Sequence, residues 1–153
     1  MRHPFERLVS AYIDKVVPEE GYLAEAFREE FGEPTFSKFV GKVLKGAPRG
    51  SFNIHWEPFI SACSYCYFNY SFISKLETVD EDREVILETV GARVPERKRI
   101  QNQKIGKKIE NVTSDLFSEL TTEACDALAS IYRYDLEMFE YDSEKYLKNC
   151  NRG

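Results

Sequence analysis

The most informative stretch of this 153-residue sequence is its N-terminus, Arg2-His3-Pro4-Phe5-Glu6-Arg7-Leu8-Val9-Ser10-Ala11-Tyr12. Proline is favoured at the first helical position, where its missing N–H costs nothing, so we expect a helix to begin at Pro4. From there to Val16 the apolar residues recur every three or four positions, as on one face of an amphipathic helix. Pro18 and Gly21 end the pattern. The stretch therefore predicts a helix with one buried face over residues 4–16.

Polar side chains at the start of this helix are suited to binding an anion. Arg2 lies just before the helix N-terminus, where free backbone N–H groups and the helix dipole attract negative charge. An arginine can hold a phosphate through two parallel hydrogen bonds, and Ser10, two turns on, adds a hydroxyl donor. The alternative, from these residues alone, is that Arg2 is simply solvated.

The rest of the chain predicts helices with at most one strand. Helical patterns cover residues 22–31, 35–44, 80–90, 121–139 and 143–147, with Thr35 and Asp80 as N-caps. In the helix at 80–90 we expect an inward face made of Val85, Ile86, Leu87 and Val90. Residues 72–76 have the composition of a short strand. A strand needs partners for its backbone, so either the domain is mostly helical or further strands lie outside this sequence.

The composition restricts the class of protein. Hydrophobic residues make up 42% of the chain and aromatic residues 14%, which are too many for a disordered chain. No apolar run reaches the roughly 18 residues of a membrane span, and the N-terminal region lacks the apolar core of a signal peptide. The net charge of −5 argues against a general nucleic-acid binder, so we expect no nucleic-acid partner. The chain is therefore expected to be globular, without a transmembrane segment of its own.

Basic residues are concentrated between residues 93 and 108. That stretch has seven basic residues and one acidic residue, although the chain as a whole is acidic. It has too few large apolar residues to form a core element. We therefore predict that residues 93–112 form a basic, flexible loop, with contact to a sulfated or carboxylated glycan as the functional alternative.

Cysteines and sequons together favour an oxidising lumen. The four cysteines, which allow three full disulfide pairings, are Cys63, Cys66, Cys125 and Cys150. N-glycosylation sequons begin at Asn69 and Asn111. Three interpretations exist for Cys63-x-x-Cys66, namely a zinc site, a redox pair or disulfide partners. A zinc site would want four ligands and only one such pair exists, so we expect no metal.

The N-terminal stretch resembles the 3′-phosphate-binding motif of sulfotransferases, Arg-x-Pro-x-x-Arg-x-x-Ser. It is most similar to the Golgi carbohydrate sulfotransferases, the group that contains the chondroitin 4-O and HNK-1 enzymes. Further motifs follow the order of that family: His55-Trp56-Glu57-Pro58, Cys63-Ser64-Tyr65-Cys66, Ile73-Ser74-Lys75-Leu76-Glu77-Thr78 with Asp82, and Ile131-Tyr132-Arg133-Tyr134-Asp135-Leu136. Ser71 and Ser74 depart from the family, which usually has Asp and Gly at these positions. The resemblance covers most of the chain except the basic stretch.

The resemblance implies a nucleotide site and a transfer reaction. In the family, the first Arg and the Ser of the motif hold the 3′-phosphate of 3′-phosphoadenosine 5′-phosphosulfate, which assigns that role to Arg2 and Ser10. Arg7 is expected to pack or pair locally, and His3 to be structural or a minor contact of the nucleotide. His55 is the candidate catalytic base, because a His near neutral pKa can take the proton of a sugar hydroxyl. The alternative for His55 is a structural corner.

The resemblance also implies a fold and a cellular setting. The complete enzyme would have an α/β, P-loop-like sulfotransferase fold with the nucleotide at the strand ends. Residues 1–153 would be a partial sulfotransferase domain, the helix-rich C-terminal part with few strands of its own. The acceptor would be a glycan or glycosaminoglycan in the Golgi lumen, with a membrane anchor in the full-length form. In that lumen we expect at least one disulfide, involving Cys63 or Cys66.

One element of the family pattern has no counterpart here. In the family, the loop that cradles the 5′-phosphosulfate precedes the 3′-phosphate motif. The nearest glycine-rich candidate, residues 41–47, lacks the Lys-Ser/Thr ending of a phosphate loop and lies inside a helical pattern. We therefore expect a carbohydrate sulfotransferase fragment that is inactive alone. The alternative is a catalytically inactive binding or regulatory domain that retains the C-terminal half of the fold.

Overall fold

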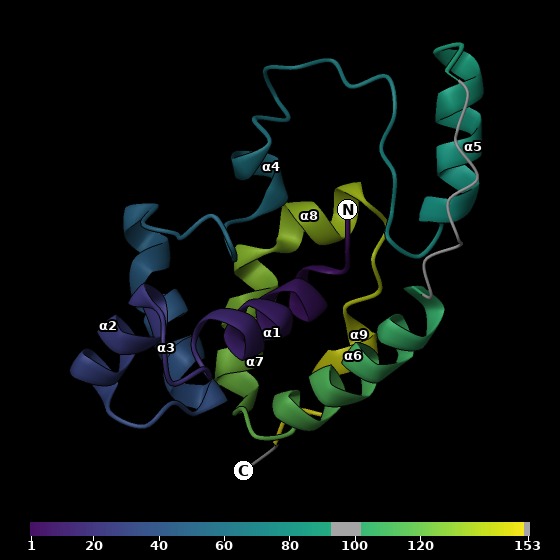
Figure 1. The fold of residues 1–153 in the computed structure, drawn as a ribbon. Coiled ribbons are helices and arrows are strands. Elements are labelled where there is room, and N and C mark those ends of the chain that lie inside the picture. Colours follow the sequence, from purple (N-terminus) through teal and green to yellow (C-terminus); the bar gives the residue numbers. More distant parts are fainter. Residues whose placement is uncertain (93–101, 152–153) are drawn as a thin grey trace.

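The computed structural model of the chain describes residues 1–92 and 102–151 (Figure 1). Its helices, in chain order, are α1 (Pro4–Lys15), α2 (Tyr22–Phe31), α3 (Phe36–Gly46), the 3₁₀ turn η1 (Ala47–Arg49), α4 (Phe59–Ala62), α5 (Val79–Thr89), α6 (Asn102–Phe117), α7 (Thr122–Ile131), α8 (Arg133–Met138) and α9 (Glu144–Leu147). Within these residues the backbone pairs in β fashion only at an isolated bridge between Thr121 and Asn151. The helix-rich part of the fold prediction is confirmed, and a P-loop-like sheet stays a prediction.

Helix α1 lies at the centre of the hydrophobic core. Phe5, Leu8 and Val9 have no exposed surface, as the apolar spacing of the sequence predicts. α1 packs against α6, and the ring centroids of Phe5 and Phe117 are 4.9 Å apart. In turn, α9 packs against α6 and α7. α1 is therefore fixed by a core that joins the N-terminal and C-terminal parts of the chain.

Most predicted helices are confirmed, with their ends. α1 and α2 begin at Pro4 and Tyr22, and Thr35 caps α3 by accepting the N–H of Lys38 at 3.3 Å. The helix predicted at 121–139 is divided into α7 and α8. The division falls at Tyr132, whose φ of −95° and ψ of 10° depart from α-helical values. The short helix predicted at 143–147 is α9.

The predictions for residues 72–90 are wrong in three respects, namely the strand, the helix cap and the buried face of the helix. Residues 72–76 form no strand, because in the described part of the chain they have no partner strand; the N–H of Leu76 donates instead to the carbonyl of Met1 at 2.6 Å. α5 is a helix, but it begins at Val79 rather than at a cap on Asp80, and it buries none of its residues. Val85 is 57% exposed. In Figure 1, α5 stands apart from the other helices.

The prediction of a loop over residues 93–112 is wrong for its second part. α6 begins at Asn102, so residues 102–112 are helical. Ile109 and Val112 pack against the core, which gives this part of α6 the apolar contacts that a helix needs. Residues 93–101 lie outside the described residues.

A disulfide joins Cys125 of α7 to Cys150, after α9. The expected disulfide is therefore present, but its predicted partners are wrong, because Cys63 and Cys66 are both free thiols. The fold decides the pairing, since the bridge between Thr121 and Asn151 brings the end of the chain beside the start of α7. Both bonded cysteines are buried, whereas Cys66 is exposed.

Candidate functional site

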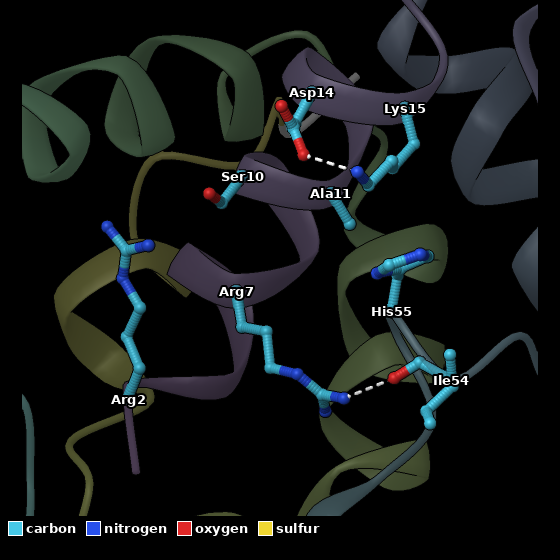
Figure 2. Close-up of a pocket in the computed structure, with 8 residues that line it drawn as sticks. All are labelled: Arg2, Arg7, Ser10, Ala11, Asp14, Lys15, Ile54 and His55. Carbon is cyan, nitrogen blue, oxygen red and sulfur yellow. Dashed lines mark hydrogen bonds and ion pairs between the residues drawn. The ribbon is translucent and has the colours of Figure 1, made fainter. Parts of the chain in front are cut away.

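The candidate site residues predicted from the sequence line one surface pocket (Figure 2). It has a volume of about 250 Å³ and lies between α1 and the loop that precedes α4. Its lining residues are Arg2, Arg7, Ser10, Ala11, Asp14, Lys15, Ile54 and His55. The three predicted site residues all belong to this set, although His55 is distant from the other two in sequence. Three of the lining residues are cationic and one is acidic, so the pocket favours an anion.

Arg2 lies at one end of the pocket with its guanidinium incompletely paired. Its Nε is 3.6 Å from Oε2 of Glu6, one turn into α1, which is too far for a hydrogen bond. Glu6 also accepts a hydrogen bond from the Tyr146 hydroxyl and pairs with Nζ of Lys145 at 3.6 Å. The Arg2 Nε is buried and has no hydrogen-bond partner among the described residues. A buried donor without an acceptor is unfavourable, and an anion bound here would offset that cost.

His3 fixes the start of α1 beside Arg2. Its Nδ1 accepts the N–H of Phe5 at 3.2 Å, and its Nε2 lies 3.1 Å from the carbonyl oxygen of Asp142. These two contacts require the neutral ring with its proton on Nε2. Burial lowers the pKa of His3, which favours the neutral form. The ring is not among the groups that line the pocket, and its contacts are those of a structural residue.

Ser10 and the pair that follows it continue the pocket along α1. In Figure 2, the Ser10 hydroxyl lies on the same side of α1 as the Arg2 guanidinium. Asp14 and Lys15 form an ion pair, with Nζ 2.8 Å from Oδ2. The hydrogen bond from Lys15 lowers the pKa of Asp14, so the carboxylate stays charged and paired. This pairing reduces the repulsion that Asp14 would exert on a bound anion.

Arg7 is occupied by protein carbonyl groups. One terminal nitrogen donates to the carbonyl of Ile54 at 2.6 Å, and the other donates to the carbonyl of Glu57. The guanidinium also lies over the Phe59 ring, 4.2 Å from its centroid. Arg7 does pack and pair within the protein, as expected, but its partners are not local, since they are 47 and 50 residues away in sequence. Its partners lie on the two sides of His55, which no feature of the sequence indicates.

His55 is exposed at the edge of the pocket, on the loop between η1 and α4. Its backbone N–H donates to Oδ1 of Asn53 at 3.1 Å, as in an Asx turn. One residue on, the carbonyl of Trp56 accepts the Tyr132 hydroxyl at 2.6 Å. The backbone around His55 is therefore fixed, while its imidazole remains accessible from the pocket.

Within residues 1–92 and 102–151, no three His, Cys, Asp or Glu side chains gather in a way that could hold a metal ion. None of the described helices is long and apolar enough to cross a membrane.

A family model described as "Sulfotransferase family" matches residues 1–142 of the chain. The chain belongs to the sulfotransferase family. This membership confirms the resemblance found in the N-terminal motif. No solved structure matches this sulfotransferase-family chain.

Curated relatives are carbohydrate sulfotransferases. Carbohydrate sulfotransferase 11 of Mus musculus is 28% identical over 167 residues, which cover 97% of this chain and 47% of that protein. Carbohydrate sulfotransferase 9 of Homo sapiens is 27% identical over 162 residues, 92% of this chain and 36% of that protein. Carbohydrate sulfotransferase 14 of Danio rerio is 31% identical over 116 residues, 63% of this chain and 31% of that protein. This sulfotransferase-family chain thus spans less than half the length of these relatives.

The sequence analysis did not identify the other residues that line the pocket, although the helical spacing predicts which residues of α1 share a face. Arg7, Ala11 and Lys15 are spaced four residues apart, and such residues lie on one face of a helix. Ser10 and Asp14 have the same spacing and lie on the adjoining row. With Ser10 as a candidate ligand residue, the helical spacing therefore predicts the other residues of α1 that line the pocket.

Proposed function

We propose that this chain carries the 3′-phosphate site of a carbohydrate sulfotransferase. The proposed reaction transfers a sulfuryl group from 3′-phosphoadenosine 5′-phosphosulfate to a hydroxyl group of a glycan or glycosaminoglycan. The observation that carries the proposal is the pocket shared by Arg2 and Ser10 of the motif and by His55. The names of the relatives support a carbohydrate as the acceptor.

The residues present fit the 3′-phosphate of this nucleotide. Arg2 would bind it, since its buried Nε lacks an acceptor among the described residues. Ser10 would donate its hydroxyl to a phosphate oxygen. The backbone at the start of α1 contributes less than a helix N-terminus usually does, because Pro4 has no N–H and the N–H of Phe5 is taken by His3. Phosphate binding would therefore depend mainly on side chains, and on Arg2 above all.

His55 would act as the general base of the transfer. Its imidazole would take the proton of the acceptor hydroxyl as the hydroxyl oxygen bonds to sulfur. The bond between sulfur and the bridging phosphate oxygen breaks, and 3′-phosphoadenosine 5′-phosphate leaves with that oxygen. The proton ends on the His55 ring, and the sulfuryl group ends on the sugar.

A second role for His55 is favoured by its place in the same pocket as Arg2 and Ser10. An imidazolium there could donate a hydrogen bond to the 3′-phosphate itself. The two roles differ in their effect on binding, because a base for the acceptor does not touch the 3′-phosphate.

Calorimetric titration with 3′-phosphoadenosine 5′-phosphate tests the proposal and separates the two roles. The wild-type chain should bind, and absence of binding would contradict the proposed function. If His55 is only the base, His55→Ala should change the Kd by less than about twofold. If His55 binds phosphate, His55→Ala should weaken binding by more than that, because the variant loses a hydrogen bond to a charged group.

The cellular setting belongs to the same proposal. We infer a Golgi lumen for the site, which the Cys125–Cys150 disulfide supports because such bonds persist in oxidising compartments. A membrane anchor in the full-length form stays a prediction.

A further inference from the structure

The loop that carries His55 is held by its backbone. From residue 54 to residue 60, five backbone groups are bonded to side chains of other elements. They are the carbonyls of Ile54, Trp56 and Glu57 and the N–H groups of Phe59 and Ile60. Loops of this length usually satisfy their backbone with water or with their own turns. The side chains that hold this one are Arg7, Tyr132 and Asp135.

Two of the three side chains come from the C-terminal part of the chain. Tyr132 bonds the Trp56 carbonyl, and the Asp135 carboxylate accepts the N–H of Phe59 at 2.6 Å and that of Ile60 at 2.9 Å. Asp135 is 1% exposed and caps the first turn of α4. These contacts fix the loop to α7 and α8, but they do not set its distance from α1.

Arg7 connects the His55 loop to α1. Its guanidinium bonds the carbonyls of Ile54 and Glu57, which lie on either side of His55, and its face covers Phe59. Only a planar group with several fixed donors can bond both carbonyls and cover a ring at once, and lysine has neither the plane nor the fork. Burial lowers the pKa of Arg7 and raises that of Asp135, and the charge of each opposes the shift of the other. The two charges therefore support each other while both side chains hold the same loop.

We infer that Arg7 is a positioning residue that sets the place of His55 relative to the anion site on α1. Arg7 and Ser10 lie one turn apart on α1, so the Arg7 guanidinium connects the His55 loop to the part of α1 that carries the anion site. The inference rests on the proposed function, because it assumes that Arg2 and Ser10 bind the nucleotide and that His55 acts beside it. Arg7 itself does not contact the phosphate in this account, because each of its terminal nitrogens already bonds a carbonyl of the His55 loop.

Histidine NMR on the isotope-labelled chain tests the inference. The chain has 2 histidines, so its spectrum has one ring signal from His3 and one from His55, assigned with His55→Ala. In the wild type, 3′-phosphoadenosine 5′-phosphate should shift the His55 signal until the site is saturated. In Arg7→Gln the nucleotide should still bind with a Kd within about threefold of the wild type, while the shift of the His55 signal falls below about a third.

Arg28→Gln is the matched control. Arg28 also holds a turn: its guanidinium donates to the carbonyl of Pro18 at 2.6 Å and to the carbonyl of Val17 at 2.9 Å. Arg28 does not line the pocket. This variant should leave both the Kd and the His55 shift at wild-type values. An undiminished His55 shift in Arg7→Gln would overturn the inference. A rise of about tenfold or more in its Kd would overturn it too, because Arg7 would then be a ligand.

The free protein separates this inference from the proposed function. Without nucleotide, Arg7→Gln should already move or broaden the His55 signal and leave the His3 signal in place, whereas Arg28→Gln should move neither. A wild type that does not bind the nucleotide would defeat the proposed function, yet this comparison would still show whether Arg7 positions His55. Should Arg7→Gln not fold, Arg7→Lys should give the same His55 change with the charge retained. A wild-type His55 signal in Arg7→Lys would contradict the role of the guanidinium fork.

Discussion

Helices α1 and α5 were both predicted to bury an apolar face, and only α1 does so. α1 has one acidic residue in its first turn and regularly spaced apolar residues, whereas α5 has three acidic residues there and its apolar residues 85–87 are consecutive. α1 buries Phe5, Leu8 and Val9 completely, whereas α5 buries none of its residues. The difference lies in the partner, since α1 packs against α6 and α5 has no extensive contact with another described helix. Periodicity therefore predicts that a helix forms, but it does not predict what covers the helix.

The same contrast extends to the segments beside the two helices. The segment before α5 exposes large aromatic side chains, with Tyr67 at 88% and Phe68 at 63%. The segment before α1 is fixed by the contacts of His3 with Phe5 and Asp142. A site that binds a phosphate and places a base beside it needs rigid support. In the described part of the chain, that support surrounds α1.

The largest effect expected from this contrast concerns the cysteines. The Cys125–Cys150 bond closes a loop of 25 residues within the buried region, and such a loop is worth about 3.5 kcal/mol of stability. Cys150→Ser should lower the free energy of unfolding by about that amount in urea titrations. Cys66→Ser, at an exposed free thiol, should leave it unchanged. Equal losses in the two variants would contradict the contrast between the regions.

A matched pair of valines sharpens the comparison between the helices themselves. Val9 of α1 has no exposed surface and Val85 of α5 is 57% exposed. Val9→Ala should lower the free energy of unfolding by roughly 2–3 kcal/mol through lost burial and the cavity it leaves. Val85→Ala should change it by less than about 0.5 kcal/mol. A large loss for Val85→Ala, measured by urea unfolding, would mean that α5 is covered after all.

A smaller effect is expected from His3, and it depends on pH. Burial lowers the pKa of His3 in the folded state below its usual value of about 6.5. Below about pH 6.5 the unfolded chain takes up a proton that the folded chain does not, so the free energy of unfolding falls as the pH falls. The loss reaches at most about 1.4 kcal/mol per pH unit and ends at the folded pKa.

Unfolding measured at two pH values isolates this contribution. Between about pH 7.5 and pH 5.5 the free energy of unfolding should fall more in the wild type than in His3→Gln. Identical pH dependence in the wild type and His3→Gln would show that His3 does not stay neutral in the folded chain.

The sequence predicted what depends on neighbouring residues and missed what depends on distant ones. Pro4, Thr35 and the apolar spacing of α1 are local signals, and they place α1 and α3 correctly. The strand at 72–76 failed because composition cannot supply a partner strand. The disulfide pairing failed because Cys125 and Cys150 meet only in the folded chain, with Cα atoms 6.6 Å apart.

The candidate site follows the same division. Arg2, Ser10 and His55 could be named from their chemistry and from motifs, and the pocket that they share is a result of folding. The role of Arg7 could not be predicted, because it depends on where the carbonyls of Ile54 and Glu57 lie. Every residue has a backbone carbonyl, so the sequence cannot show which carbonyls a side chain will bond.

The central claim is that Arg2 and Ser10 form a 3′-phosphate site, and paired nucleotide binding tests it most directly. Calorimetry would compare 3′-phosphoadenosine 5′-phosphate with adenosine 5′-phosphate on the wild type and on Arg2→Ala, with Arg133→Ala as a control on an exposed arginine. We expect Arg2→Ala to weaken binding of the first nucleotide by about tenfold or more, because it loses charge-assisted hydrogen bonds to phosphate, and binding of the second by less than about threefold. Equal losses for the two nucleotides would contradict the assignment.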